Sequence, residues 1–329
     1  MIAVALNAFV ARGQSEGDSD WNHFGANFRL GLNIKTKFSN VGTFTGPAAP
    51  PLTGGVDHNY ADGFVKLDSS GDRGGVTWNW GYKNASQVSG NGTLLMHTAS
   101  SEGASSAVND DPRLGLDVNY ARDLGRVGSG RWGLKVALGF TDVKIRDSQT
   151  LSGAVNLTTD AYSLGSITPP QAPYAGSFNG PGPVIGDTPN RSLSTVPGGA
   201  TISGSRQLDA WLYDFRFGPY ISLPLVHRLA LEVGGGLAAG VADSTFSFAD
   251  TTTTSGGSIQ ASGSGNSTST KIGFYGEVGL AYQILSEASI FAGGQFQYLG
   301  EFNQSLAGRT AEMDLRHSYY FVVGLQLHF

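Results

Sequence analysis

The sequence predicts an all-β protein that folds as a closed, antiparallel, up-and-down transmembrane β-barrel. Three observations support this fold class: apolar residues alternate with polar ones over long stretches, connections alternate between short and long, and the last residues form a strand with one apolar face. A period of two indicates a β-strand, because successive side chains point to opposite faces. The stretches are about ten residues or longer, which is enough to cross a bilayer at a tilt.

The composition excludes several other classes of protein. Of the 329 residues only 14% are charged, against about 25% in soluble domains, yet no apolar run approaches the roughly 18 residues of a transmembrane helix. The net charge of -5, without a cluster of Lys and Arg, does not suggest a nucleic-acid partner. The absence of Cys removes disulfides and thiolate metal sites.

The start of the chain has an apolar run over residues 2–10, followed by small residues. This pattern resembles the core of a secretion signal, although the usual positively charged start is missing. We therefore expect residues 1–13 to be a signal-peptide remnant and residues 14–329 to form a single barrel domain. A frayed tail or a short extra strand is the alternative.

Eleven stretches have the alternation of a strand. The clear ones are residues 24–38, 113–120, 131–140, 209–218, 229–241, 271–284, 289–300 and 319–329, and the weaker ones are 57–67, 76–82 and 93–97. Bacterial single-chain barrels have even strand numbers, so we predict about 12 strands, with 10 as the alternative. The missing strand is expected before residue 112 or within residues 153–165.

The connections predict short periplasmic turns and long extracellular loops. Short turns are expected at residues 124–130, 223–228 and 285–288, and long loops at 100–111, 147–203, 251–268 and 301–311. The Ser/Thr/Gly-rich stretch at 251–270 is expected to be mobile. The Pro/Gly-rich loop at 147–203 is expected to be functional or disordered, as a constriction in the mouth, a lid, or a contact with other subunits.

If the apolar faces meet lipid, the opposite faces line the lumen. The charges predicted to face it are Arg29, Lys35, Asp117, Lys135, Asp214, Arg216, Glu232, Glu277 and Arg316. Their signs are nearly balanced, and they could either line a water-filled pore or pair across the lumen and close it. The small residues Gly234, Gly236, Ala238 and Gly240 add no bulk to one wall and favour the pore.

The end of the chain resembles a known signature. Alternate residues of the last strand are apolar and the final one is aromatic: Tyr319, Phe321, Val323, Leu325, Leu327 and Phe329. This pattern resembles the C-terminal signature of Gram-negative outer-membrane β-barrel proteins, and the likeness in pattern extends over residues 21–329. The resemblance implies an integral protein of the outer membrane, surrounded by lipid. It also implies that the barrel-assembly machinery reads the last strand, which closes against the first.

We predict a channel for weakly selective, passive diffusion of small solutes. Two alternatives stay open: a structural or adhesive barrel with a closed lumen and functional extracellular loops, and a hydrolase at the rim. We expect no enzyme and no cofactor, because the six histidines have no metal-ligand spacing. Asp314 and His317, three apart on one strand, point to opposite faces. Small solutes in the lumen and a homo-oligomer are the other partners that the sequence leaves open.

Overall fold

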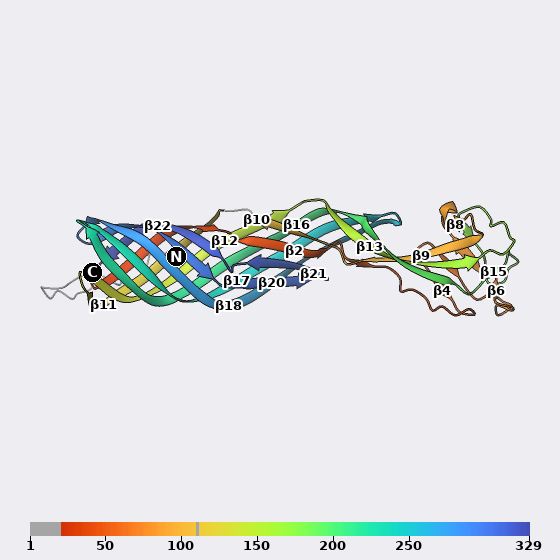
Figure 1. Ribbon diagram of the computed structural model, residues 1–329, viewed down its shortest axis with the longest axis horizontal. Coiled ribbons are helices and arrows are strands. Elements are labelled where there is room, and N and C mark those ends of the chain that lie inside the picture. Colours follow the sequence, from red (N-terminus) through yellow and green to blue (C-terminus); the bar gives the residue numbers. More distant parts are fainter. Residues whose placement is uncertain (1–20, 110–111) are drawn as a thin grey trace.

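The computed structural model describes residues 21–109 and 112–329, so the proposed signal remnant at 1–13 lies outside the described residues. The molecule is elongated, with a barrel at one end, a β-sandwich in the middle, and a small domain at the far end (Figure 1). Over the described ranges, no helix is long and apolar enough to cross a membrane.

The barrel is a ring of eight antiparallel strands in sequence order, and the pairing of β12 with β16 closes it. The first and last strands also pair: the backbone of Asn22 makes two hydrogen bonds with that of Phe329, at 3.1 and 3.0 Å. The prediction of a closed, up-and-down antiparallel barrel is therefore confirmed. Its strands are β1 (Asn22–Leu32), β11 (Arg113–Val127), β12 (Gly130–Asp147), β16 (Asn190–Val226), β17 (Leu229–Thr254), β18 (Gly257–Leu285), β19 (Ala288–Tyr298) and β22 (Ser318–His328).

The predicted number of barrel strands, twelve or ten, is wrong. The main sheet does contain twelve strands, but four of them lie outside the closed ring: β3 (Phe44–Thr45), β8 (Val88–Ser89), β9 (Thr93–Ser101) and β13 (Leu151–Ser163). The weak strands predicted before residue 100 belong to β9 and to the small far domain. The alternation of side chains identifies a strand, but a strand outside the membrane alternates in the same way.

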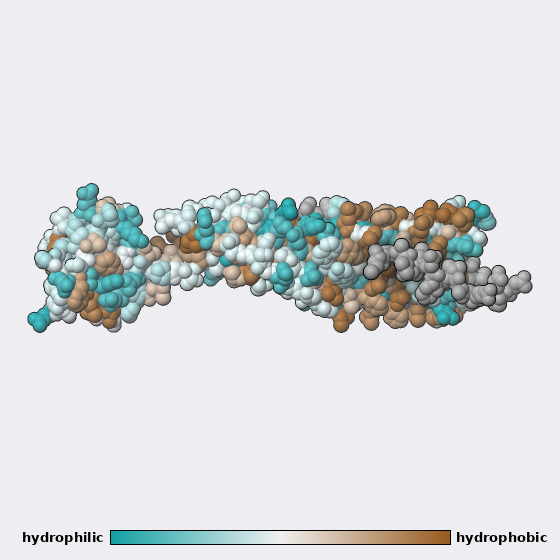
Figure 2. All heavy atoms as spheres, turned by 180° about the vertical axis from the view of Figure 1, so that it is seen from behind, coloured by the Kyte–Doolittle hydropathy of each residue, from teal (hydrophilic) through white to brown (hydrophobic). Residues whose placement is uncertain are grey.

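The outer face of the barrel is a belt of exposed apolar side chains, and hydrophobic residues gather at this end of the molecule (Figure 2). Phe28, for example, is 75% exposed. Aromatic residues contact one another at the extracellular edge of the belt, where the ring centroids of Phe140 and Trp211 lie 5.0 Å apart and those of Phe274 and Tyr298 lie 5.2 Å apart. So large an exposed apolar surface is stable only against lipid, and aromatic girdles mark the interfaces.

The residues of the C-terminal signature belong to this belt. All six side chains are more than a third exposed on the outer face of the barrel: Tyr319, Phe321, Val323, Leu325, Leu327 and Phe329. Their apolar side therefore faces lipid. That the assembly machinery reads this strand stays a prediction.

The connections are short at one end of the barrel, as predicted, and at the other end three are long. The long loop predicted at 251–268 is wrong, since β17 and β18 are joined there by a turn at residues 255–256. The stretch at 251–270 is an exception to the expectation of mobility, because it forms the ends of β17 and β18, which are paired up to Thr254 and Gly257. Ser and Thr side chains suit an exposed strand, and the ladder of hydrogen bonds orders it without a buried core. Residues 147–203 likewise contain β13 and the first part of β16.

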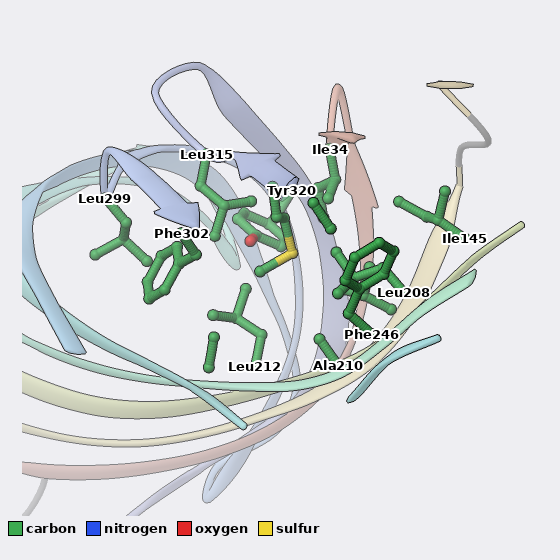
Figure 3. Close-up of a cluster of buried hydrophobic side chains, with 14 of the residues drawn as sticks. Ile34, Ile145, Leu208, Ala210, Leu212, Phe246, Leu299, Phe302, Leu315 and Tyr320 are labelled. Carbon is green, nitrogen blue, oxygen red and sulfur yellow. The ribbon is translucent and has the colours of Figure 1, made fainter. Parts of the chain in front are cut away.

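A second sheet packs on the extracellular parts of the barrel strands and forms the sandwich. Its order is β10 (Ala104–Asn109), β2 (Lys35–Val41), β21 (Arg309–Asp314) and β20 (Glu301–Leu306). Figure 3 shows the side chains that fill the space between the two sheets. This apolar core includes Ile34, Phe38, Ile145, Leu208, Leu212, Phe246, Leu299, Phe302, Met313 and Leu315.

The distal domain, at the far end, has a core of its own. It consists of β4 (His58–Asn59), β5 (Gly63–Val65), β6 (Val76–Thr77), β7 (Trp80–Tyr82), η1 (Ala85–Gln87), β8, β14 (Tyr174–Ala175) and β15 (Ile185–Gly186). Trp80, Leu94, Met96 and Tyr162 are fully buried in it. The neck, which joins this domain to the sandwich, is formed by β3, β9, β13 and residues 190–200 of β16 (Figure 1).

Candidate functional site

The barrel interior contains a network of buried ion pairs. Arg29 donates from Nη1 to Oδ2 of Asp214 at 2.6 Å, and both side chains are fully buried. Oδ1 of Asp214 lies 2.9 Å from Nε of Arg216, which also contacts Asp117 and Gln295. Asp214 and Arg216 are two positions apart on β16 and so share its inward face, and Arg29, Asp117 and Gln295 reach them from the inward faces of β1, β11 and β19.

A second group of charges lies beside the first. Lys135 donates to Oε1 of Glu277 at 2.7 Å, and Gln326 donates to Oε2 of Glu232 at 3.2 Å. The cavity between the two groups of charges has a volume of about 10 Å³. A single water needs roughly 10–15 Å³, so this cavity holds about one water molecule at most.

Seven of the nine predicted lumen residues lie in these two groups, but Lys35 and Arg316 are exposed and lie outside the barrel. The cause for Lys35 is a break at Asn33, whose φ of 61° reverses the alternation: Leu32 points outward, whereas Ile34 is fully buried. Arg316 lies in a turn after β21 and donates to Asp314 at 2.8 Å. A period of two predicts that both side chains face the lumen only if the strand continues unbroken, and the strand is broken before each of them.

The small residues of β17 make room for neighbouring side chains. A Cβ at Gly240 would lie 2.6 Å from Cδ1 of Leu299, and one at Gly234 would lie 3.0 Å from Oε1 of Glu277. Ala238 is buried in the same core. Gly236 packs against the backbone of Phe217 on the neighbouring strand. Atoms of neighbouring residues therefore fill the space that these small residues leave, and the lumen is not widened there.

The extracellular side of the barrel is filled a second time, by the sandwich core and by buried charges above it. Nε of Arg206 lies 3.0 Å from Oδ2 of Asp147, and Nε of Arg309 lies 3.0 Å from Oδ2 of Asp250. An apolar core thus lies between two ionic layers in the described part of the molecule.

The periplasmic mouth holds a polar cluster that the sequence analysis missed. The Nδ1 atoms of His23 and His328 lie 2.6 Å apart, and Nε2 of His23 lies 3.2 Å from Asp123. Oγ of Ser289 lies 2.7 Å from Nε2 of His328, and Tyr220 donates to Asp123. The two histidines are 305 positions apart, and only the pairing of β1 with β22 brings them together.

The junction of the neck and the distal domain is held by a buried carboxylate. Asp160 accepts hydrogen bonds from Tyr60 at 2.6 Å and from two nitrogens of Arg191, each at 2.7 Å. Arg191 also donates to the carbonyl of Pro50 at 2.7 Å. Burial acts to raise the pKa of Asp160, but the hydrogen bonds from Arg191 and Tyr60 outweigh it and hold this pKa below its usual range. Burial and the hydrogen bond to Asp160 raise the pKa of Tyr60.

No group of three or more His, Cys, Asp or Glu side chains within residues 21–109 and 112–329 is arranged to hold a metal ion. The polar side chains described above bind one another, so their arrangement fixes strands and junctions.

A closed barrel with a lipid-facing belt, aromatic girdles and extended extracellular strands defines an integral β-barrel protein of the outer membrane. No family model matches the chain, and no curated protein matches it. Among solved structures, the chain is similar to Ail, the attachment invasion locus protein of Yersinia pestis, in complex with the heparin analogue sucrose octasulfate. The identity is 9%, the match covers 95% of this chain and 100% of Ail, and the TM-score is 0.32.

Two further structures are similar at the same level. The outer membrane protein OprG from Pseudomonas aeruginosa is 10% identical, with 96% of this chain and 99% of OprG covered and a TM-score of 0.32. The outer membrane protease OmpT from Escherichia coli is also 10% identical, with 96% and 99% covered and a TM-score of 0.30. Likeness of this degree indicates no common function.

Proposed function

We propose that this protein is an outer-membrane anchor that holds an extracellular binding domain away from the cell surface, and that it conducts no solutes. The observation that carries the proposal is the filled interior: buried ion pairs in the barrel and an apolar core directly above them. An eight-stranded barrel is just wide enough for side chains to fill, in agreement with this arrangement. The competing hypothesis is the weakly selective diffusion channel.

The length of the strands supports a role in display. The part of β16 from Asn190 to Trp211, at the girdle, spans roughly 70 Å at about 3.3 Å per residue. This is more than twice the roughly 30 Å of a hydrocarbon core. Because β16 continues from the membrane into the neck, with a β-bulge opposite Gly153–Val155, it connects the distal domain directly to the barrel.

Binding, rather than catalysis, is part of this proposal. The chain of contacts from Ser289 through His328 and His23 to Asp123 has the residue types of a hydrolase site, but Ser289 is only 4% exposed. The contact between His23 and His328 joins the first and last strands, which suits a structural role in closing the barrel. We also propose that the barrel-assembly machinery acts on β22.

Two measurements on the full chain test the proposal. In planar lipid bilayers we expect no stable current steps, whereas a diffusion channel gives ohmic openings. Bacteria that display the chain should attach to a panel of immobilised glycans and matrix proteins, and the variant Trp80→Ala should abolish attachment. Trp80 is fully buried in the distal domain, so this change disrupts that domain while the heat-modifiable gel shift of the barrel is kept. Open-channel currents, or attachment that is insensitive to Trp80→Ala, would refute the proposal.

A further inference from the structure

One side of β16 has no strand partner in the neck. On its first side, β16 pairs with β13 from Asn190 opposite Ala161 to Val196 opposite Val155. On its second side, pairing with β17 begins only at Thr201. From Asn190 to Val196, the backbone N–H and C=O groups on that second side therefore have no strand partner among the described residues. Such an edge is a template for another extended chain.

The sequence of this edge lacks the usual protection against pairing. Residues 192–196 read SLSTV, without charge and without Pro. Natural edges are blunted by Lys, Pro or a bulge, and here Pro197 and the left-handed Gly198 come only after the open stretch. Leu193 is 75% exposed and Val196 is 43% exposed, although both lie outside the lipid belt.

A groove of about 480 Å³ crosses one face of the neck sheet and ends at the same edge, at Leu193, Ser194 and Thr195. One face of the neck sheet forms its floor, in rows of paired side chains: Thr45, Ser100, Asn156 and Thr195 in one row, and Thr98, Thr158 and Leu193 in the other. Residues 46–49 form one wall. Every lining residue is uncharged, and the nearby charges of Arg191 and Asp160 are paired with each other.

We propose that this edge and groove bind an extended, uncharged polypeptide segment of a partner protein, which adds as a strand to β16. The proposal rests on the display function above and names the class of partner for the neck, the part of the displayed region that adjoins the distal domain. The added strand occupies the line that β17 would follow if it continued past Thr254. The β17–β18 turn limits the strand at one end and the distal domain limits it at the other, so about seven residues fit.

The groove determines the chemistry of the partner's side chains. Alternate side chains of an added strand project from the groove face of the sheet, beside Leu193 and Thr195 of β16. Small, β-branched or hydroxyl-bearing side chains fit there, since each can pack on a neighbouring strand without a buried charge. Affinity comes from main-chain hydrogen bonds, and the exclusion of charge supplies selectivity.

The test uses a fluorescent, N-acetylated and C-amidated heptapeptide of alternating Thr and Val, titrated with the full chain in detergent micelles. We expect saturable binding by fluorescence anisotropy. A peptide N-methylated at every residue, which lacks donors on both sides, should bind at least about tenfold more weakly. The variant Leu193→Lys should weaken binding of the first peptide by a similar factor, while Val184→Lys, an equally drastic change at an exposed residue of the distal domain, should not.

The outcomes separate this inference from the display function. Three results with the peptides would overturn the inference: absence of saturable binding, equal binding of the methylated peptide, or no effect of Leu193→Lys. Self-association of the chain that only Leu193→Lys prevents would overturn it as well. Attachment of displaying bacteria that survives Leu193→Lys would keep the display function and reject this edge. Peptide binding without any attachment would keep the edge and reject display. A gel-shift and circular-dichroism comparison of both Lys variants confirms that they fold.

Discussion

The stability of the variant Asp214→Ala tests whether side chains or water fill the interior of the barrel. The Asp214 carboxylate lies 2.6 Å from Nη1 of Arg29 and 2.9 Å from Nε of Arg216. The side chains of Arg29 and Asp214 are fully buried, so Asp214→Ala leaves two guanidinium groups close together without their shared partner. Breaking such a buried pair costs about 3–5 kcal/mol, whereas loss of a hydrated pair costs only about 0–1 kcal/mol.

The assay is urea unfolding in phospholipid vesicles, followed by tryptophan fluorescence and by the gel shift of the barrel. The control is Asp142→Ala, which removes a comparable but exposed ion pair, 2.7 Å from Lys144. In the double variant Arg29→Met with Asp214→Leu, most of the lost stability should return, because both charges leave together. A cost for Asp214→Ala within about 1 kcal/mol of the control would refute the packed interior and favour a water-filled lumen.

Three further predictions follow from the same structure. Trp80→Ala should cost about 3–5 kcal/mol and expose the distal domain to protease while the barrel stays folded, and Trp80→Phe should cost clearly less; equal protection of both variants would contradict this. Because the pKa of Asp160 is held below its usual value, its stabilisation of the neck is complete above about pH 4 and is lost as the pH falls through the lowered pKa. In Asp160→Asn, the protection of the neck against protease should no longer fall at acidic pH in this way. An unchanged dependence on pH would count against the pair with Arg191. Gly139→Val should place a side chain onto Arg29 and reduce the folded fraction on gels, while Gly294→Ala, where a Cβ meets open space, should be neutral.

The sequence predicts the class of fold because the belt imposes a strict pattern. Every barrel strand presents alternate apolar side chains to lipid, and the short turns between Val127 and Gly130 and between Val226 and Leu229 mark one end of the barrel. The number of strands could not be obtained in this way. Strands of the neck and sandwich alternate like those of the barrel, and a single positive φ at Asn33 moves the chain from one sheet to another.

The state of the interior was also hidden from the sequence. Lys135 and Glu277 are 142 positions apart, and nothing local shows that they meet. The glycines of β17 gave a misleading signal for the same reason: a small residue leaves space, but only the fold decides whether Leu299 fills it. The hydroxyl-rich hairpin around Thr254 has the composition of a mobile loop, but backbone pairing between the consecutive strands β17 and β18 orders it.

The strand count connects the fold to the function. The interior of a barrel widens as strands are added, so the same inward charges could stay hydrated in a ring of twelve, whereas in a ring of eight they meet and exclude water. A barrel filled with side chains is poorly suited to conduct solutes but well suited to anchor an extracellular domain. β16 continues for 37 residues from the periplasmic turn into the neck, where it pairs with β13, and its ladder with β17 begins at Thr201, so one strand connects the neck to the membrane. The anchor and the support are thus parts of the same strands, and the open edge of β16 lies where that ladder first lacks a partner.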